Sequence, residues 1–259
     1  FRREHECEFL IFDETLISSI TLADMEGNAP VETTGQVRWF KKPTPGMTYM
    51  VSLDPAMGTG GDFAAIQVFE LPTFEQVGEW HHNTTPMNQQ IRILQGINKH
   101  IYDTIMEQDA SASPQIFYSM ENNTIGEAAL LRVMDIGEEN IQGMFLSEPI
   151  RKGHRRKFRR GFNTTAKFKI DACTKFKELI EGGKMKINSQ LLISELKDFV
   201  ASGLSFKAKP GQHDDLVSAC LLMTRMMKVL ADFDPKIFEK WTDRTSELTP
   251  MPIFGSFTG

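Results

Sequence analysis

Two aspartates bracket a glycine-rich turn early in the chain. Asp54 follows an apolar run at residues 49–53, and Asp62 precedes a second run at residues 64–69. Both runs are short and bounded by turn residues, so they predict two strands of a β-hairpin. A carboxylate at the end of a buried strand is costly unless it is paired, and a divalent cation is an economical partner. The alternative is that both aspartates are ordinary turn residues.

Further acidic residues stand at comparable points of the expected structure. Glu121 directly follows residues 115–120, whose pattern predicts a strand, and Asp214 and Asp215 begin the last strong helical pattern. If the strands before Asp54 and Glu121 are neighbours, their ends and the helix start face one crevice. Carboxylate oxygens without an ordered Cys or His cluster suit Mg²⁺ or Mn²⁺. We therefore expect these four acids to bind metal, and two ions roughly 4 Å apart would support phosphodiester hydrolysis.

The residues around these acids also have plainer interpretations. Asp214 and Asp215 could simply cap the helix that they begin, where its dipole favours negative charge. His213 is placed to orient water or to contact a phosphate, whereas His81 and His82, at the end of an expected strand, are expected to be structural.

The hydrophobic pattern predicts the elements that must position the acids. A strand at residues 74–81 follows the hairpin, and apolar residues at helical spacing predict a long helix from Thr85 to about residue 105. Thr124 and Glu127 have the spacing of a capping box for the next helix. The other expected elements are a short helix within residues 15–25, strands at residues 141–146 and 185–187, and helices at residues 163–180, at residues 189–199 and from residue 213.

A dense basic run follows the expected strand at residues 141–146. It contains seven cations and no acid: Arg151, Lys152, Arg155, Arg156, Lys157, Arg159 and Arg160. Such density on a chain with a net charge of −5 is typical of a loop that binds nucleic-acid phosphates. No side-chain set for reading bases is recognisable, so we expect binding without sequence preference. The alternative is a solvated loop that pairs with acids of a partner domain.

Composition is ordinary for a globular protein, with 259 residues, 41% apolar and 24% charged. No apolar run approaches the roughly 18 residues of a membrane span. Three scattered cysteines indicate neither a zinc site nor a disulfide framework and fit a reducing cytoplasm. The proline- and glycine-containing sequence at residues 42–46 is typical of a domain boundary. We expect residues 1–46 to be an appended segment or linker and residues 47–232 to be the main domain. Residues 233–259 are expected to form an aperiodic tail. The first residue, Phe1, suggests a domain excised from a longer chain.

The predicted order of strands and helices, with acids at these points, resembles the ribonuclease H-like fold, an α/β architecture in which helices flank a mixed sheet. Three sequences resemble the nuclease domain of the large terminase subunit of T-even-like tailed phages: LDPAMG at residues 53–58, MEN at residues 120–122 and GQHDDLVSA at residues 211–219. This resemblance implies that Asp54, Glu121 and one of Asp214 or Asp215 form the metal-binding, catalytic triad. We favour Asp215 as the ligand.

The same resemblance implies an activity and partners. It implies a Mg²⁺- or Mn²⁺-dependent endodeoxyribonuclease that cuts concatemeric double-stranded DNA without strong sequence preference. The expected partners are double-stranded DNA, an N-terminal ATPase domain of the same full-length chain, a portal ring and a small terminase subunit. The expected location is the host cell cytoplasm, at the viral procapsid. No GxxxxGK[ST] nucleotide-binding loop occurs in these residues.

Three other interpretations stay open. A resolvase-type ribonuclease H-like nuclease would carry a similar acidic triad but would require a dimer. Half of an actin-like sugar kinase or ATPase would use Asp54 and the glycine turn for phosphate, and would need a second domain to bind adenosine. A catalytically silent docking module would bind DNA and a portal ring through the basic run and the tail. Replacing the acids by amides would leave the function of such a module intact.

Overall fold

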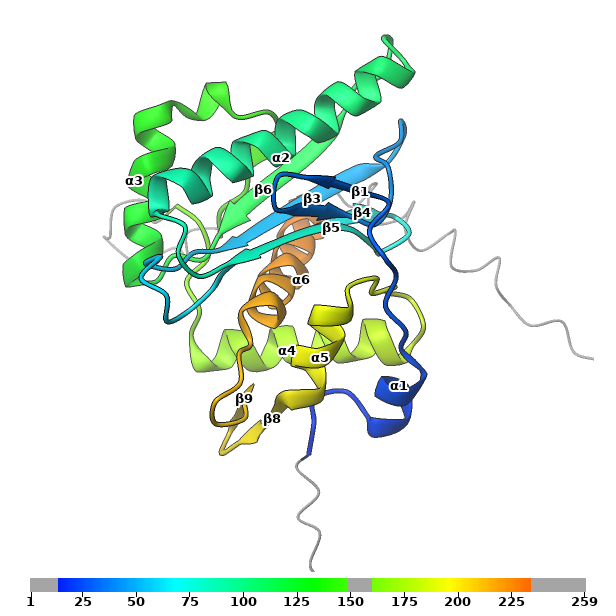
Figure 1. Ribbon diagram of the computed structural model, residues 1–259, viewed down its shortest axis with the longest axis vertical. Coiled ribbons are helices and arrows are strands. Elements are labelled where there is room, and N and C mark those ends of the chain that lie inside the picture. Colours follow the sequence, from blue (N-terminus) through cyan, green and yellow to red (C-terminus); the bar gives the residue numbers. More distant parts are fainter. Residues whose placement is uncertain (1–13, 149–159, 234–259) are drawn as a thin grey trace, which may run out of the picture.

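The structure is a computed structural model that describes residues 14–148 and 160–233. Its centre is a seven-stranded mixed sheet with the strand order β1-β2-β5-β4-β3-β6-β7 (Figure 1). The strands are β1 (Glu32–Thr34), β2 (Val37–Trp39), β3 (Thr48–Asp54), β4 (Ala64–Leu71), β5 (Glu75–His82), β6 (Gln115–Met120) and β7 (Met144–Phe145). The mixed sheet with flanking helices confirms the predicted fold class.

The centre of the sheet is the part that positions the acids. Strands β3 and β4 form the predicted antiparallel hairpin, in which Asp54 is the partner of Ala65. Strand β6 lies on the other side of β3 and runs parallel to it, with Leu53 opposite Met120. Asp54 is the last residue of β3, and Glu121 directly follows β6. Because neighbouring parallel strands end at the same edge of a sheet, the two acids lie at adjacent strand ends, as the sequence predicts.

Helices cover both faces of the sheet (Figure 1). Helices α2 and α3 lie on one face, and α4, α5 and α6 lie on the other. The bounds are α1 (Ser19–Asp24), α2 (Met87–Gln108), α3 (Thr124–Ile136), α4 (Ala166–Glu181), α5 (Gln190–Asp198) and α6 (Asp215–Phe233), with a short 3₁₀ helix, η1 (Glu138–Asn140). Among the residues described, no helix is both long and apolar enough to cross a membrane.

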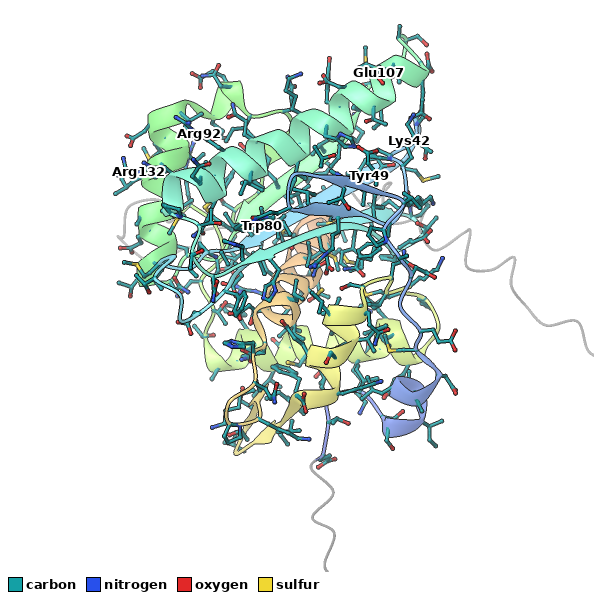
Figure 2. The ribbon with its side chains drawn as sticks, in the orientation of Figure 1. Lys42, Tyr49, Trp80, Arg92, Glu107 and Arg132 are labelled. Atoms are coloured by element: carbon teal, nitrogen blue, oxygen red, sulfur yellow. The ribbon has the colours of Figure 1, made fainter. Side chains whose placement is uncertain are left out.

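Helix α2 packs on the sheet through the stripe that its sequence predicts. The side chains of Ile91, Leu94 and Ile101 are completely buried, and they join a cluster with Tyr49 of β3 and Trp80 of β5. Figure 2 labels Tyr49 and Trp80 within the sheet layer beneath α2. Spacing of three and four residues places these apolar side chains on one side of the helix, so α2 is amphipathic with its polar side in solvent.

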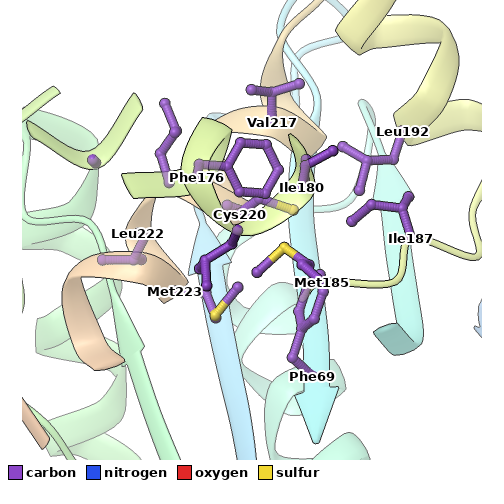
Figure 3. Packing of buried hydrophobic residues seen from close by; sticks show 14 of the residues in the cluster. Phe69, Phe176, Ile180, Met185, Ile187, Leu192, Val217, Cys220, Leu222 and Met223 are labelled. Atoms are coloured by element: carbon purple, nitrogen blue, oxygen red, sulfur yellow. The ribbon is translucent and has the colours of Figure 1, made fainter. Parts of the chain in front are cut away.

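Helix α6 forms the second core with α4 and α5. Val217, Cys220 and Met223 of α6 pack near Phe176 of α4 and Phe69 of β4 (Figure 3). The methionines at residues 226 and 227 are buried in this cluster too, so the methionine-rich stripe of α6 is core in this structure. Apolar residues nearly all round α6 bury it deeply, and this fixes its N-terminus, where Asp215 lies, against the sheet.

Several elements differ from the sequence-based expectation. Residues 32–39, expected within an appended segment, add two strands to the main sheet: β2 pairs with β5, and β1 pairs with β2. Residues 141–146 contain only the two-residue strand β7, and residues 185–187 make an isolated bridge between Lys186 and Glu75 instead of a strand. Isolated short apolar runs do not reveal how many ladder hydrogen bonds a neighbour will supply.

The predicted helix starts also shift. Asn123, not Thr124, caps α3, because its side-chain oxygen accepts a hydrogen bond from the Gly126 N–H. Helix α2 begins at Met87, and the hydroxyl of Thr85 pairs with His82 instead of capping it. An unpredicted hairpin, β8 (Phe199–Ser202) and β9 (Ser205–Ala208), leads into the last helix. Propensity and spacing place helix ends only to within a residue or two.

Candidate metal centre

Asp54 and Glu121 lie at the ends of two neighbouring strands. The Glu121 N–H donates to the Leu53 carbonyl at 3.1 Å, which continues the β3–β6 ladder past the strand end. The pKa of Asp54 is raised well above its usual range, by burial first and then by the carboxylates of Glu121, Asp215 and Asp214. Like charges held close together repel one another. A cation bound beside Asp54 would offset this repulsion.

Asp215 and Asp214 have different surroundings although they are adjacent. Asp215 is the first residue of α6, and its buried Oδ2 has no hydrogen-bond partner within residues 14–148 and 160–233. This oxygen lies 3.5 Å from His213 Nδ1. Burial, followed by the charge of Asp214, raises the pKa of Asp215 to about 6. Asp214 Oδ2 instead accepts the Ala208 N–H at 3.3 Å and lies 3.8 Å from Lys169 Nζ. The carboxylate with an unused buried oxygen is thus that of Asp215.

The N-terminus of helix α6 is capped by a side chain from another helix. No local sequence motif predicts this cap. Glu195 of α5 accepts the Val217 N–H at 3.1 Å, and burial raises the pKa of Glu195 to about 9. Its Oε1 lies 3.8 Å from Nε2 of His81, and burial lowers the pKa of His81 to about 4. The His81 ring stacks on Phe63 at 4.2 Å. Sequence reasoning missed Glu195 because its partner is 22 residues away.

The turn after Asp54 requires glycine at one position. Gly58 has a φ of +72°, and a Cβ there would lie 2.3 Å from the Thr85 carbonyl oxygen. Only glycine combines a left-handed backbone with so close an approach. The turn therefore packs backbone against backbone on the segment that follows β5. Asp62, at the far end of the turn, is exposed.

The acids fit a divalent ion by their chemistry without forming a finished shell. Within residues 14–148 and 160–233, no three Asp, Glu, His or Cys side chains converge as a ready-made metal site. Glu121 raises the pKa of Asp54 through its charge, and one buried oxygen of Asp215 has no hydrogen-bond partner among the described residues. A hard cation with oxygen ligands would satisfy all of these groups at once. The assignment of Asp54, Glu121, Asp214 and Asp215 to metal stays a prediction.

The basic run lies mostly outside the described residues, which exclude Arg151, Lys152, Arg155, Arg156, Lys157 and Arg159. Arg160 is described and pairs with Glu138, and its carbonyl accepts the Asn122 side-chain amide at 2.7 Å. Phe162 pairs with Glu121 as a parallel bridge. The chain therefore leaves the basic run directly beside the strand end that carries Glu121.

The raised pKa of Asp215 predicts how the metal-free domain responds to pH. A carboxyl group whose pKa is higher in the folded than in the unfolded chain costs stability as the pH rises past its unfolded value. For Asp215 this window runs from about pH 4, the unfolded pKa, to the folded pKa of about 6. We would measure the free energy of unfolding by urea titration in EDTA. Between pH 4 and 7, we expect this free energy to fall by about 2 kcal/mol more in the parent than in Asp215→Asn. Parallel pH curves for the two proteins would contradict this expectation.

The fold and the acidic cluster together define a class, the α/β nucleases of the ribonuclease H-like fold. A model of the family described as the Terminase RNaseH-like domain matches residues 51–226. The chain belongs to this family, which is the family that the sequence motifs indicate. The narrower resemblance to T-even-like phages stays a prediction.

Solved structures of similar fold are terminase nucleases. The large terminase nuclease from thermophilic phage G20c with bound magnesium has a TM-score of 0.60 at 16% identity, covering 82% of this chain and 97% of that chain. The large terminase nuclease domain of Thermus phage P74-26 gives 0.57 at 16% identity, with 81% and 94% covered. The manganese-soaked, inhibitor-bound human cytomegalovirus terminase nuclease domain gives 0.52 at 14%, with 82% and 95% covered. At these identities the similarity establishes the fold.

Proposed function

We propose that this domain is the metal-dependent endonuclease of a viral DNA-packaging terminase and cuts concatemeric double-stranded DNA without strong sequence preference. The observation that carries the proposal is the meeting of four acids from three separate places in the fold. Asp54 ends β3 and Glu121 follows the neighbouring end of β6, beyond the Leu53–Met120 pair. Glu121, Asp215 and Asp214 all raise the pKa of Asp54, the last two from the start of α6. Family membership independently supports a nuclease.

The four acids differ in how free their carboxylates are to bind a metal ion. Asp54, Glu121 and Asp215 would bind Mg²⁺ or Mn²⁺, which when bound would activate a water and stabilise the leaving oxygen of the phosphodiester. Asp214 is a weaker candidate ligand, because its carboxylate already bonds to β9 and faces Lys169. The similar nucleases solved with magnesium and with manganese support the choice of a divalent ion.

The test is a plasmid assay with the purified domain. Supercoiled plasmid is incubated with Mg²⁺ or Mn²⁺, and a parallel reaction contains EDTA. We expect nicked and linear products only when metal is available. The absence of nicking with either metal would refute the proposed activity and would favour the interpretation as a docking module.

We expect the basic run to supply affinity for DNA. In the double variant Arg155→Glu with Arg159→Glu, the affinity should fall, and the slope of log affinity against log salt should become shallower by about one unit for each phosphate that the loop no longer binds. Binding is measured by filter retention of duplex DNA in EDTA across a salt series. Arg92→Glu with Arg132→Glu is the matched control, because it reverses two charges on α2 and α3, on the opposite face of the sheet from α6 (Figure 2). An unchanged slope in the first double variant would rule out this loop as a DNA-binding element.

The wider setting follows from the same proposal. The domain would work beside an N-terminal ATPase domain of the same full-length chain, with a portal ring and a small terminase subunit as assembly partners. It would act in the host cell cytoplasm, at the procapsid. Family membership supports this setting, because terminases package viral DNA.

A further inference from the structure

Gln90 of α2 is a completely buried amide behind the candidate metal centre. Its Nε2 donates to the Ala56 carbonyl at 2.7 Å and to the Thr85 carbonyl at 2.8 Å. Its Oε1 accepts the Ala56 N–H at 3.3 Å. Both amide hydrogens are thus used on backbone carbonyls, and Ala56, two residues after Asp54, is held at both its backbone polar groups.

These contacts join two turns that end different strands. The turn after β3 carries Asp54, and the turn after β5 contains Thr85. The same turns meet again at their tips, where the Gly60 N–H donates to the Asn83 carbonyl at 2.9 Å and the Asn83 side chain donates to the Gly60 carbonyl at 3.1 Å. Gly58 brings the two backbones together between these points. The two turns therefore form one body, with Gln90 at its buried end.

An apolar side chain cannot replace the hydrogen bonds that this buried amide makes. An apolar side chain of similar size would fill the same volume, but it would leave two carbonyls and one N–H without partners in a site closed to water. Those groups would then have to move to find new partners. Asp54, at the end of β3, is only two residues from Ala56, so its carboxylate would move with them.

We propose that Gln90 is a positioning residue for Asp54: by bonding to Ala56 and Thr85, it holds the turn after β3 in the geometry that lets the Asp54 carboxylate bind a divalent ion. The inference rests on the proposed metal-dependent function and adds to it a residue that contacts neither metal nor substrate. Groups that orient metal ligands from behind change metal affinity or activity by about 10- to 100-fold when they are removed.

The test compares Gln90→Met with Gln95→Met. Gln95 lies on the same helix, and its side chain donates to the Asn140 carbonyl, near the end of α3. For each protein we would measure the Mn²⁺ concentration that gives half of the metal-induced rise in Tm, then kcat and KM on plasmid at saturating Mn²⁺, and duplex binding in EDTA. For Gln90→Met we expect the Mn²⁺ midpoint to rise and kcat to fall by about tenfold or more, with metal-free DNA binding unchanged. Gln95→Met should match the parent.

A second pair of variants keeps the inference testable if Gln90→Met does not fold. Gly58→Ala would push against the Thr85 carbonyl from the other side of the same contact, at 2.3 Å. Its control is Gly183→Ala, because Gly183 has a similar left-handed φ of +65° and a Cβ there would meet no atom of the described residues within 4 Å. Gly58→Ala should raise the Mn²⁺ midpoint as Gln90→Met does, and Gly183→Ala should lower only Tm.

The outcomes separate this inference from the proposed function. If the parent cleaves and gains Tm with Mn²⁺ while Gln90→Met and Gly58→Ala keep its midpoint and kcat, the positioning role is wrong and the nuclease assignment stands. If the parent neither cleaves nor responds to metal, the proposed function fails, and the role of Gln90 fails with it. A raised Mn²⁺ midpoint in either variant, with its control unchanged, supports the role.

Discussion

Plasmid cleavage by Asp54→Asn, Glu121→Gln and Asp215→Asn is expected to fall by more than about a hundredfold, since even groups that only orient metal ligands change activity by about 10- to 100-fold. Each substitution keeps the size of the side chain and removes a charged oxygen that the metal would need. Comparing Asp214→Asn with Asp215→Asn tests which of the two adjacent acids binds the metal. Because the Asp214 carboxylate is already bonded to Ala208, we expect this variant to keep much more activity than Asp215→Asn.

Stability distinguishes loss of metal binding from loss of fold in these variants. Without metal at neutral pH, Asp54→Asn and Asp215→Asn should melt no lower than the parent, because each removes a carboxyl group whose pKa is raised and which therefore costs stability above its unfolded pKa. Added Mg²⁺ or Mn²⁺ should raise the Tm of the parent more than that of the three variants, since an ion stabilises only the state that binds it. Variants that still cleave, or that gain Tm as the parent does, would show that these acids are not one metal site.

Among the variants proposed here, Arg225→Met is expected to lower the free energy of unfolding most, by about 2–3 kcal/mol. It breaks a largely buried ion pair and leaves the partner charge without its cation. Arg225 of α6 pairs with Glu148 and donates to the Asn163 carbonyl and the Thr164 hydroxyl, both at 3.0 Å. The Phe162 ring also flanks its guanidinium, at 5.2 Å. One side chain thus ties α6 to the two described segments that flank the basic run.

Urea unfolding at neutral pH measures this effect. Arg132→Met is the control, because Arg132 is exposed and makes an i,i+3 pair with Asp135, so its loss should change the free energy of unfolding by less than about 1 kcal/mol. Adding Glu148→Gln to Arg225→Met should recover part of the loss by removing the stranded charge. Equal losses in Arg225→Met and Arg132→Met would show that the pair at Glu148 contributes little.

The sequence by itself determined the central architecture and most of the candidate site. The alternating and helical apolar patterns predicted β3, β4, β5, β6 and the long helix α2, because local side-chain periodicity reflects which face of an element is buried. The placement of Asp54 and Glu121 directly after two such strands predicted that they meet, and the β3–β6 register brings them together. The motifs around these acids indicated the family to which the chain belongs.

Tertiary structure alone decided the parts that depend on contacts distant in sequence. Strands β1 and β2 are too short to be seen in a pattern. Strand β2 pairs with the edge that β5 offers, and β1 pairs in turn with β2. Nothing local shows that Glu195 caps α6, or that Gln90 holds the Ala56 backbone. The sequence also does not show that Asp214 bonds to β9 while one oxygen of Asp215 has no hydrogen-bond partner in the described part of the chain. Periodicity reports burial, whereas the choice of a hydrogen-bond partner depends on which elements the folded chain brings within about 3 Å.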